Sequence, residues 1–238
     1  MLIAKAFKHL GLPMAILLVA GCSAQTGGTG AGASVANSPE TKNGVYLINC
    51  SEILKPEDRV AMDAIDGMIE DREYYAALAR LESVTFDTQA HWLRWSQLLG
   101  QVGQLDASES AFSAIVDTCD SYQAYHGLGV VLVKKGQMTM AVEALDHAKE
   151  LAPADVSVRN DLGYALLRDG RYGRAAFELR TAFELSKGSP SIGQNMIAAY
   201  YLNGGESGLE VLRREVSVND EQLQSGIRLA EKLKGRMQ

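Results

Sequence analysis

Histidine and cysteine are the residues of this chain best suited to act as nucleophiles, general bases or metal ligands. They are few, and His91, His126 and His147 stand singly on predicted helices. The sequence contains no His-Glu-x-x-His zinc motif and no Gly-x-Ser-x-Gly nucleophile motif. No further cysteine or histidine lies at metal-ligand spacing from Cys50 or Cys119. The sequence therefore predicts no catalytic residue, no metal site, no cofactor and no small-molecule substrate.

A glycine-rich run at residues 27–32 has the composition of a phosphate-binding loop. Such a loop needs a strand before it and a helix after it. Here the whole of residues 23–45 is rich in Gly, Ser, Thr, Ala and Asn, so neither element is expected. We interpret residues 22–45 as a flexible linker, which would span on the order of 25 Å root-mean-square.

The composition of the 238 residues is typical of a folded protein, with 47% hydrophobic and 22% charged residues. Alanine, leucine, glutamate and glutamine are plentiful, whereas alternating runs of valine and isoleucine are scarce, which favours an all-α fold. The net charge is −6, and no basic stripe is present. An acidic chain of this kind is not expected to bind nucleic acid or an anionic lipid surface.

Residues 1–21 have the form of a secretory signal peptide, in which Lys5 and Lys8 precede a short apolar stretch from Leu12 to Ala20. That stretch is about half of the ~20 residues that a membrane-spanning helix needs. The run Leu18-Val19-Ala20-Gly21-Cys22 resembles the lipobox of bacterial lipoproteins. The resemblance implies that Cys22 receives a diacylglycerol and an acyl chain, and becomes the first residue of the mature protein. Ser23, in place of aspartate, implies the outer membrane of a Gram-negative bacterium, with the protein facing the periplasm.

Two cysteines, Cys50 and Cys119, remain once Cys22 is assigned to lipid attachment. In an oxidising compartment such as the periplasm, their thiols can pair. The bridge would close a loop of about 70 residues and stabilise the fold by roughly 4 kcal/mol in the chain-entropy model. The distance between the two residues does not follow from the sequence, so a disulfide and two free thiols both stay open.

A pattern that returns every 34 residues organises the rest of the chain. Leu128-Gly129 recurs as Leu162-Gly163, and Gly136 recurs as Gly170. A period of this size is typical of helix–turn–helix repeats that stack into a solenoid. The glycine after leucine would let two helices approach closely. Positive φ in the turns would be supplied by Gly103, Gly136, Gly170 and Gly205.

These residues resemble the tetratricopeptide repeat (TPR) family over most of residues 56–215, most clearly at 122–155 and 156–189. We expect residues 46–238 to form a TPR superhelical solenoid of about five helix pairs with a C-terminal capping helix. The pairs are predicted to begin at Pro56, to cover 88–118, 122–152 and 155–187, and to end with a pair from Pro190. In the first pair, Asp71 takes the place of the turn glycine and Val60 belongs to the apolar face. Trp92 and Trp95 are predicted to lie in the core.

The TPR resemblance implies that the first helix of each pair lines a concave, partner-binding groove. The side chains expected there are Gln123, His126, Val130, Lys134, Asn160, Tyr164, Arg168, Asn195 and Ala199. In this family, an asparagine at the places of Asn160 and Asn195 often bonds the backbone of a bound peptide. The same positions also suit solvated faces or contacts between helices, and both interpretations stay open. Lys134 and Arg168 could join the two asparagines in a weak clamp for a C-terminal carboxylate.

The lipobox, the linker and the segment from Asn160 to Tyr172 also resemble the TadD lipoproteins of the tight-adherence (Flp pilus) system. This resemblance implies a pilotin that binds a segment of a secretin by helix-in-groove recognition and carries the secretin to the outer membrane. Two alternatives stay open. One is an adaptor that scaffolds peptidoglycan enzymes, and the other is a structural part of a β-barrel or type IV pilus assembly complex. An enzyme is not expected.

Overall fold

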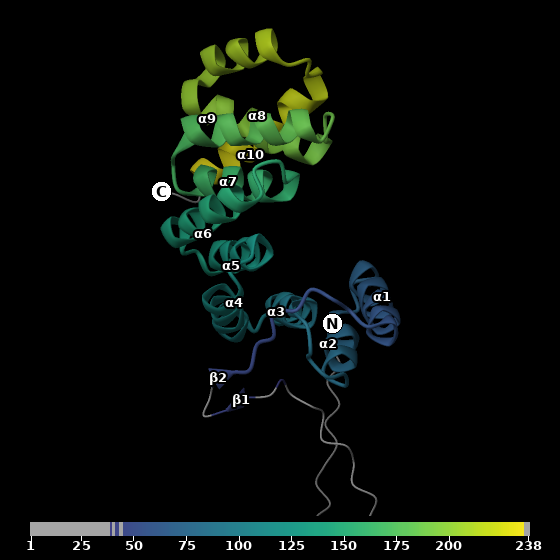
Figure 1. The fold of residues 1–238 in the computed structure, drawn as a ribbon. Coiled ribbons are helices and arrows are strands. Elements are labelled where there is room, and N and C mark those ends of the chain that lie inside the picture. The colour runs from purple at the N-terminus through teal and green to yellow at the C-terminus, as the bar shows by residue number, and fades with distance from the viewer. Residues whose placement is uncertain (1–38, 40, 43–44, 236–238) are drawn as a thin grey trace, which may run out of the picture. The chain divides into compact units, whose positions relative to one another are not determined.

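The computed structural model describes residue 39, residues 41–42 and residues 45–235, and ten helices follow one another in this part of the chain (Figure 1). They are α1 Pro56–Glu70, α2 Tyr74–Leu81, α3 Gln89–Gln101, α4 Leu105–Cys119, α5 Tyr122–Lys135, α6 Met138–Leu151, α7 Val156–Arg168, α8 Tyr172–Leu185, α9 Pro190–Glu215 and α10 Asp220–Lys234. Two short strands, β1 Thr41–Lys42 and β2 Val45–Tyr46, pair antiparallel before them. The sequence did not predict this hairpin, which begins inside the expected linker. None of the helices described is long and apolar enough to cross a membrane.

The helices pack as successive pairs, in which each helix contacts the next one along the chain. The first eight form four pairs. The fifth pair lies within α9, which is kinked at Gly205 (φ 57°, ψ −137°). A side chain at Gly208 would meet the Tyr200 carbonyl oxygen at 2.1 Å, so the two halves of α9 approach closely. α10 packs against α9. The predicted all-α solenoid of about five helix pairs with a C-terminal helix is confirmed.

The turns inside the second, third and fourth pairs use glycine at positive φ. Gly103, Gly136 and Gly170 have φ values of 87°, 80° and 78°. After each of them, an amide bonds back to a carbonyl near the end of the preceding helix. In the third pair, the Gln137 amide donates to the Leu132 carbonyl at 2.9 Å. Glycine suits this place because it has no Cβ to clash in the left-handed region.

The first pair makes the same turn without a glycine. The Glu73 amide donates to the Met68 carbonyl at 2.8 Å, and the residue before it, Arg72, has a φ of 63°. The expectation that Asp71 holds this place was wrong, because the left-handed position falls one residue later. A side chain there costs roughly 1–2 kcal/mol, which marks this pair as the least regular of the repeats.

The glycine that follows leucine in the repeat sits where two helices meet. A Cβ built on Gly129 would lie 2.4 Å from Leu145 Cγ, and one on Gly163 would lie 2.4 Å from Leu179 Cγ. Both leucines are fully buried. The predicted role of these glycines is therefore confirmed in both repeats.

Replacing Gly163 by alanine should lower the free energy of unfolding by about 1–3 kcal/mol, because the new methyl group overpacks a buried contact. Urea denaturation of the full-length protein measures the change. Gly67→Ala is the matched control, since Gly67 is an exposed helical position with nothing within 4 Å of an added Cβ. It should raise the free energy of unfolding by about 0.5–1 kcal/mol. Equal effects of the two substitutions would contradict the packing argument.

Two clusters of buried side chains form the core, one from α1 to α5 and one from α5 to α10. Trp92 and Trp95 are 1% and 7% exposed, which confirms their predicted place in the core. Val60 was predicted on the buried face of α1 but is 72% exposed. Met62 is buried in its place, together with Ile65, which lies three residues later on the same face of the helix.

The segment before α1 is part of the folded body. The ring of Tyr46 lies edge-on to Trp92 and to Trp95, with ring centroids 5.6 Å apart in each case. Further along, the Ser51 carbonyl accepts the amide of Gln89 at the start of α3 at 2.9 Å. The segment therefore packs against the tryptophan pair of the core.

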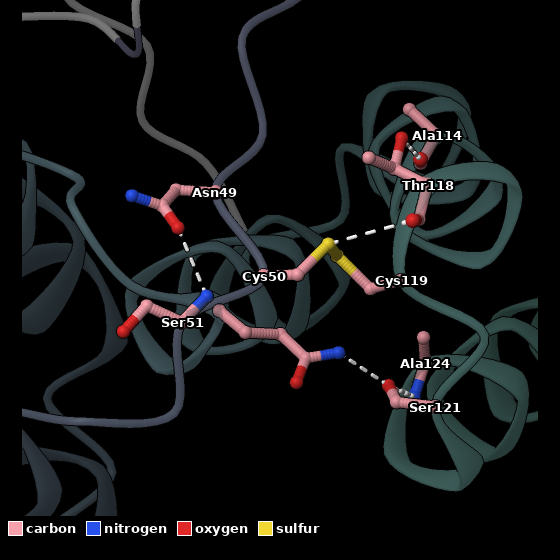
Figure 2. The surroundings of a disulfide bond; sticks show 9 residues. Asn49, Cys50, Ser51, Ala114, Thr118, Cys119, Ser121 and Ala124 are labelled. Atoms are coloured by element: carbon pink, nitrogen blue, oxygen red, sulfur yellow. Dashed lines mark hydrogen bonds between the residues drawn. A yellow bond between two sulfur atoms is a disulfide. The ribbon is translucent and has the colours of Figure 1, made fainter.

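A disulfide joins Cys50 of this segment to Cys119 at the end of α4, with the two Cα atoms 5.4 Å apart (Figure 2). The structure thus adopts one of the two arrangements that the sequence left open. Beside the bridge, the side-chain oxygen of Asn49 accepts the Ser51 amide at 2.9 Å. The bridge fixes the N-terminal segment to the second helix pair.

Candidate partner-binding groove

A pocket of about 510 Å³ lies between α3 and α5, and it is also lined by α1, α4 and the N-terminal end of α7. First helices of four successive pairs therefore contribute to one concavity, which we call the α3–α5 pocket. It is lined by Met62, Ala90, Leu93, Arg94, Gln97, Gly100, Gln101, Phe112, Tyr122, Gln123, His126, Gly127, Val130, Val131, Lys134, Asp155 and Ser157.

Four of the residues predicted to face the groove line this pocket from α5, namely Gln123, His126, Val130 and Lys134. Their spacing of three or four residues places them on one face of the helix. The residues 33 positions earlier line the opposite wall from α3, namely Ala90, Leu93, Gln97 and Gln101. Sequence reasoning missed this second set. The 33-residue step from Gly103 to Gly136 is the signal that could have found it.

Arg94 is a charged residue of the pocket whose charge is already compensated. Its guanidinium contacts both carboxylate oxygens of Asp66 on α1, at 2.7 and 2.8 Å. A third nitrogen donates to Gln97 at 2.7 Å. This bidentate pair orients Arg94 and ties α1 to α3, so its main role is to shape the wall.

Lys134, in contrast, brings a positive charge to the pocket without an acidic partner. Its ammonium group donates to the Gly100 carbonyl at 3.0 Å and to the Gln101 side chain at 3.2 Å. No carboxylate in the described part of the chain forms an ion pair with it. Burial lowers the pKa of Lys134 from its ordinary value. An incoming carboxylate would reverse that shift, because an opposite charge favours the protonated amine.

A ladder of polar side chains leads away from the pocket across three repeats. His126 on α5 contacts a carboxylate oxygen of Asp161 on α7 at 2.7 Å. The other oxygen of Asp161 accepts the Asn160 amide at 3.1 Å, and the Asn160 oxygen accepts the Asn195 amide of α9 at 3.1 Å. Asn160 and Asn195 therefore form contacts between helices, which is the second of the interpretations that the sequence left open.

Comparison with known proteins agrees with this architecture. A family model described as Tetratricopeptide repeat matches residues 122–155, which contain α5 and α6. The TPR repeat-containing protein PA4299 of Pseudomonas aeruginosa is 31% identical over 195 residues, and the match spans 82% of this chain and 73% of that protein. The chain belongs to the tetratricopeptide-repeat family. Its repeats form the kind of scaffold through which TPR domains bind protein partners or peptides.

Solved TPR structures share the fold. MamA 41-end from Desulfovibrio magneticus RS-1 superimposes with a TM-score of 0.54 at 16% identity, over 68% of this chain and 94% of that one. YrrB, described as a TPR protein with an unusual peptide-binding site, gives a TM-score of 0.50 at 19% identity, over 71% of this chain and 84% of that one. At these identities, the likeness shows the fold alone.

The remaining predicted groove residues lie outside the α3–α5 pocket. Tyr164 and Arg168 are partly buried on α7. Ala199 is fully buried in the core of the last repeats, so its place in an accessible groove was wrong. It stands 35 residues after Tyr164. Its methyl group is too short to reach the surface that a tyrosine reaches in the repeat before.

The expected signal peptide at residues 1–21 and the lipid-bearing Cys22 lie outside the described residues, as does most of the linker. They stay predictions from the sequence. So do the absence of a catalytic residue, the absence of a cofactor other than the lipid on Cys22, and the place at the outer membrane.

Proposed function

We propose that this TPR protein is a lipid-anchored pilotin or assembly factor that faces the periplasm. It holds a segment of a secretin in the α3–α5 pocket and localises the secretin of a tight-adherence (Flp) pilus system at the outer membrane. The observation that carries the binding step is a pocket built from the first helices of successive repeats. The anchor rests on the lipobox-like run that ends at Cys22 and on the linker that follows it.

The chemistry of the pocket favours a particular kind of segment. Leu93, Phe112 and Val130 offer apolar surface, which suits the apolar face of an amphipathic helix. Lys134 offers a positive charge that lacks an acidic partner, which suits an acidic side chain or a C-terminal carboxylate. The bound segment should therefore combine apolar residues at helical spacing with a carboxylate near one end.

A site-specific crosslinking experiment tests this proposal. A photo-crosslinking amino acid is placed at Gln97 or Gln123, which line the pocket from its two walls, and captured proteins are identified by mass spectrometry. Phe177 is the control position, because it is 66% exposed on α8 and lies outside the pocket. A secretin captured from the two pocket positions and not from Phe177 supports the proposal. Peptidoglycan enzymes captured there without a secretin would move the protein to the adaptor class.

Reversing the charge of Lys134 should weaken the binding of the captured segment. We expect Lys134→Glu to raise the dissociation constant about tenfold or more, because it replaces an attraction by a repulsion at the pocket. Titration of a fluorescent peptide with the sequence of the captured segment measures the change. Lys232→Glu is the matched control, since Lys232 is an exposed lysine of α10 outside the pocket. An equal loss in both variants would point to overall charge and not to the pocket.

A further inference from the structure

Three chemically active side chains meet at the first helix pair, away from the polar ladder. Asp58 lies in the first turn of α1, Asp87 lies in the loop after α2, and His91 lies in the first turns of α3. One possible ligand atom from each residue lies within 4.8 Å of those of the other two. The sequence gives no sign of this cluster, because Asp58 is 29 residues from Asp87 and no metal-binding motif contains either.

Each of the three residues carries a buried atom that has no hydrogen-bond partner. These atoms are Asp58 Oδ2, Asp87 Oδ1 and His91 Nε2. His91 is fully buried. Buried polar atoms in folded proteins are nearly always paired, so three unpaired ones in a single cluster need an explanation. A cation bound in the cluster would give the unpaired oxygens of Asp58 and Asp87 a partner beside His91, whose Nδ1 lies 3.6 Å from Asp87 Oδ1.

The surroundings of His91 suit a metal ligand. Its Nδ1 contacts the Thr88 hydroxyl at 2.8 Å, which orients the ring and leaves Nε2 free. Metal-binding histidines usually have their second ring nitrogen held in this way by a neighbouring polar group. Phe86 stacks on the ring with the centroids 5.9 Å apart. This contact shields one side of the cluster from solvent.

We propose that Asp58, Asp87 and His91 form a binding site for a divalent transition-metal ion. Zinc is the ion used to test the site. One imidazole and two carboxylates are ligands that zinc accepts. Ligand atoms about 2.0–2.2 Å from a tetrahedral zinc ion lie roughly 3.3–3.6 Å apart. The separations between the ligand atoms, which are up to 4.8 Å, therefore need to shrink by up to about 1.5 Å, and a water molecule would complete the coordination.

Lys55 modulates the charge of this site. Its ammonium group forms an ion pair with Asp87 through Oδ2, the oxygen that is not the unpaired one. The lysine side chain is 61% exposed, so it can move away from the carboxylate. It leaves Oδ1 available to a cation, but its positive charge opposes the binding of one. Removing that charge should therefore tighten metal binding.

A metal ion here would join the start of α1 to the start of α3. α1 contributes Met62 to the α3–α5 pocket, and α3 contributes one of its walls. The ion would therefore stabilise the least regular repeat next to the pocket. Binding to the folded state alone raises the apparent stability by mass action.

Calorimetric titration of the full-length protein with zinc chloride, after treatment with a chelator, tests the site. All variants carry Cys22→Ser, so that no free thiol at that position competes for the metal. We expect one zinc ion per chain, at least 30-fold weaker binding in Asp58→Asn and in His91→Gln, and about threefold tighter binding in Lys55→Met. Circular dichroism of each variant checks the fold, and Asp58→Asn keeps the test decisive if His91→Gln unfolds.

His147→Gln is the matched control. His147 is another histidine between two carboxylates, 3.7 Å from Asp120 and 3.6 Å from Glu150, but its side chain is 43% exposed, whereas that of His91 is buried. Its replacement should leave the zinc affinity unchanged. Loss of binding in His147→Gln with retention in Asp58→Asn would overturn the proposal, as would the absence of binding to the starting protein. The result of the zinc titration is independent of the crosslinking result, because the substituted residues do not line the α3–α5 pocket. These residues are Lys55, Asp58, His91 and His147.

Discussion

Replacing Cys50 and Cys119 together by alanine is expected to lower the free energy of unfolding by about 4 kcal/mol. The disulfide spans a sequence separation of 69 residues, and a loop of this size loses much conformational freedom in the unfolded chain. The bridge also holds the segment whose Tyr46 covers Trp92 and Trp95. Urea denaturation followed by tryptophan fluorescence measures the loss and reports on the two tryptophans directly.

Reduction of the unmodified protein provides a second route to the same state. The midpoint of denaturation should fall on addition of a reductant, and the double variant should show no response to it. A variant within about 1 kcal/mol of the starting protein would contradict the expected contribution. A reductant effect that persists without Cys50 and Cys119 would assign the stabilisation to another group.

Replacing Glu178 by alanine is expected to lower the free energy of unfolding by about 3 kcal/mol. This carboxylate is 5% exposed on α8 and pairs with Lys149 of α6, at 3.1 Å, and with Arg159 of α7. The lysine and the arginine are 21% and 15% exposed. Their charges would lose a buried partner in the variant, which is the costly way to break an ion pair. Thermal and urea denaturation both measure the change.

Glu184→Ala, on the same helix, is the matched control. Glu184 pairs with Arg180 at 2.9 Å, but the two side chains are 56% and 36% exposed. Solvent screens such a pair, so its loss should cost less than about 1 kcal/mol. If both glutamates cost the same, burial would not be the reason for the effect at Glu178. A loss of stability confined to Glu178→Ala would support the view that buried ion pairs of Glu178 join α6, α7 and α8.

Much of the fold could be predicted because the residues that set it act locally and repeat. The turn at Gly136 needs positive φ, and the helix contact at Gly129 needs a small residue. Both requirements return 34 residues later, at Gly170 and Gly163. The TPR resemblance, which implies that the first helix of each pair lines a groove, placed four residues of α5 on the pocket wall. It would also have placed four on α3, had the 33-residue step been applied to them.

The rest could not be predicted because it depends on how distant segments meet. Asn160 and Asn195 bond each other across two repeats, which a pattern within one repeat does not reveal. Arg72 makes a turn in which the sequence offers no glycine to mark the place. The cluster of Asp58 with His91 joins two helices that have no shared motif. Each of these contacts follows from packing between segments and not from local propensity.

The disulfide also determines how the molecule would respond to a pulling force. Tension applied at the two chain ends passes from Cys50 directly to Cys119, so α1, α2, α3 and most of α4 lie outside the stretched path. The fully extended oxidised chain should be shorter than the reduced one by roughly 230 Å, at about 3.3–3.6 Å per enclosed residue. With the proposed anchor at Cys22, a pull on the C-terminal end of the chain would unravel the C-terminal repeats. The first two would stay folded at the membrane.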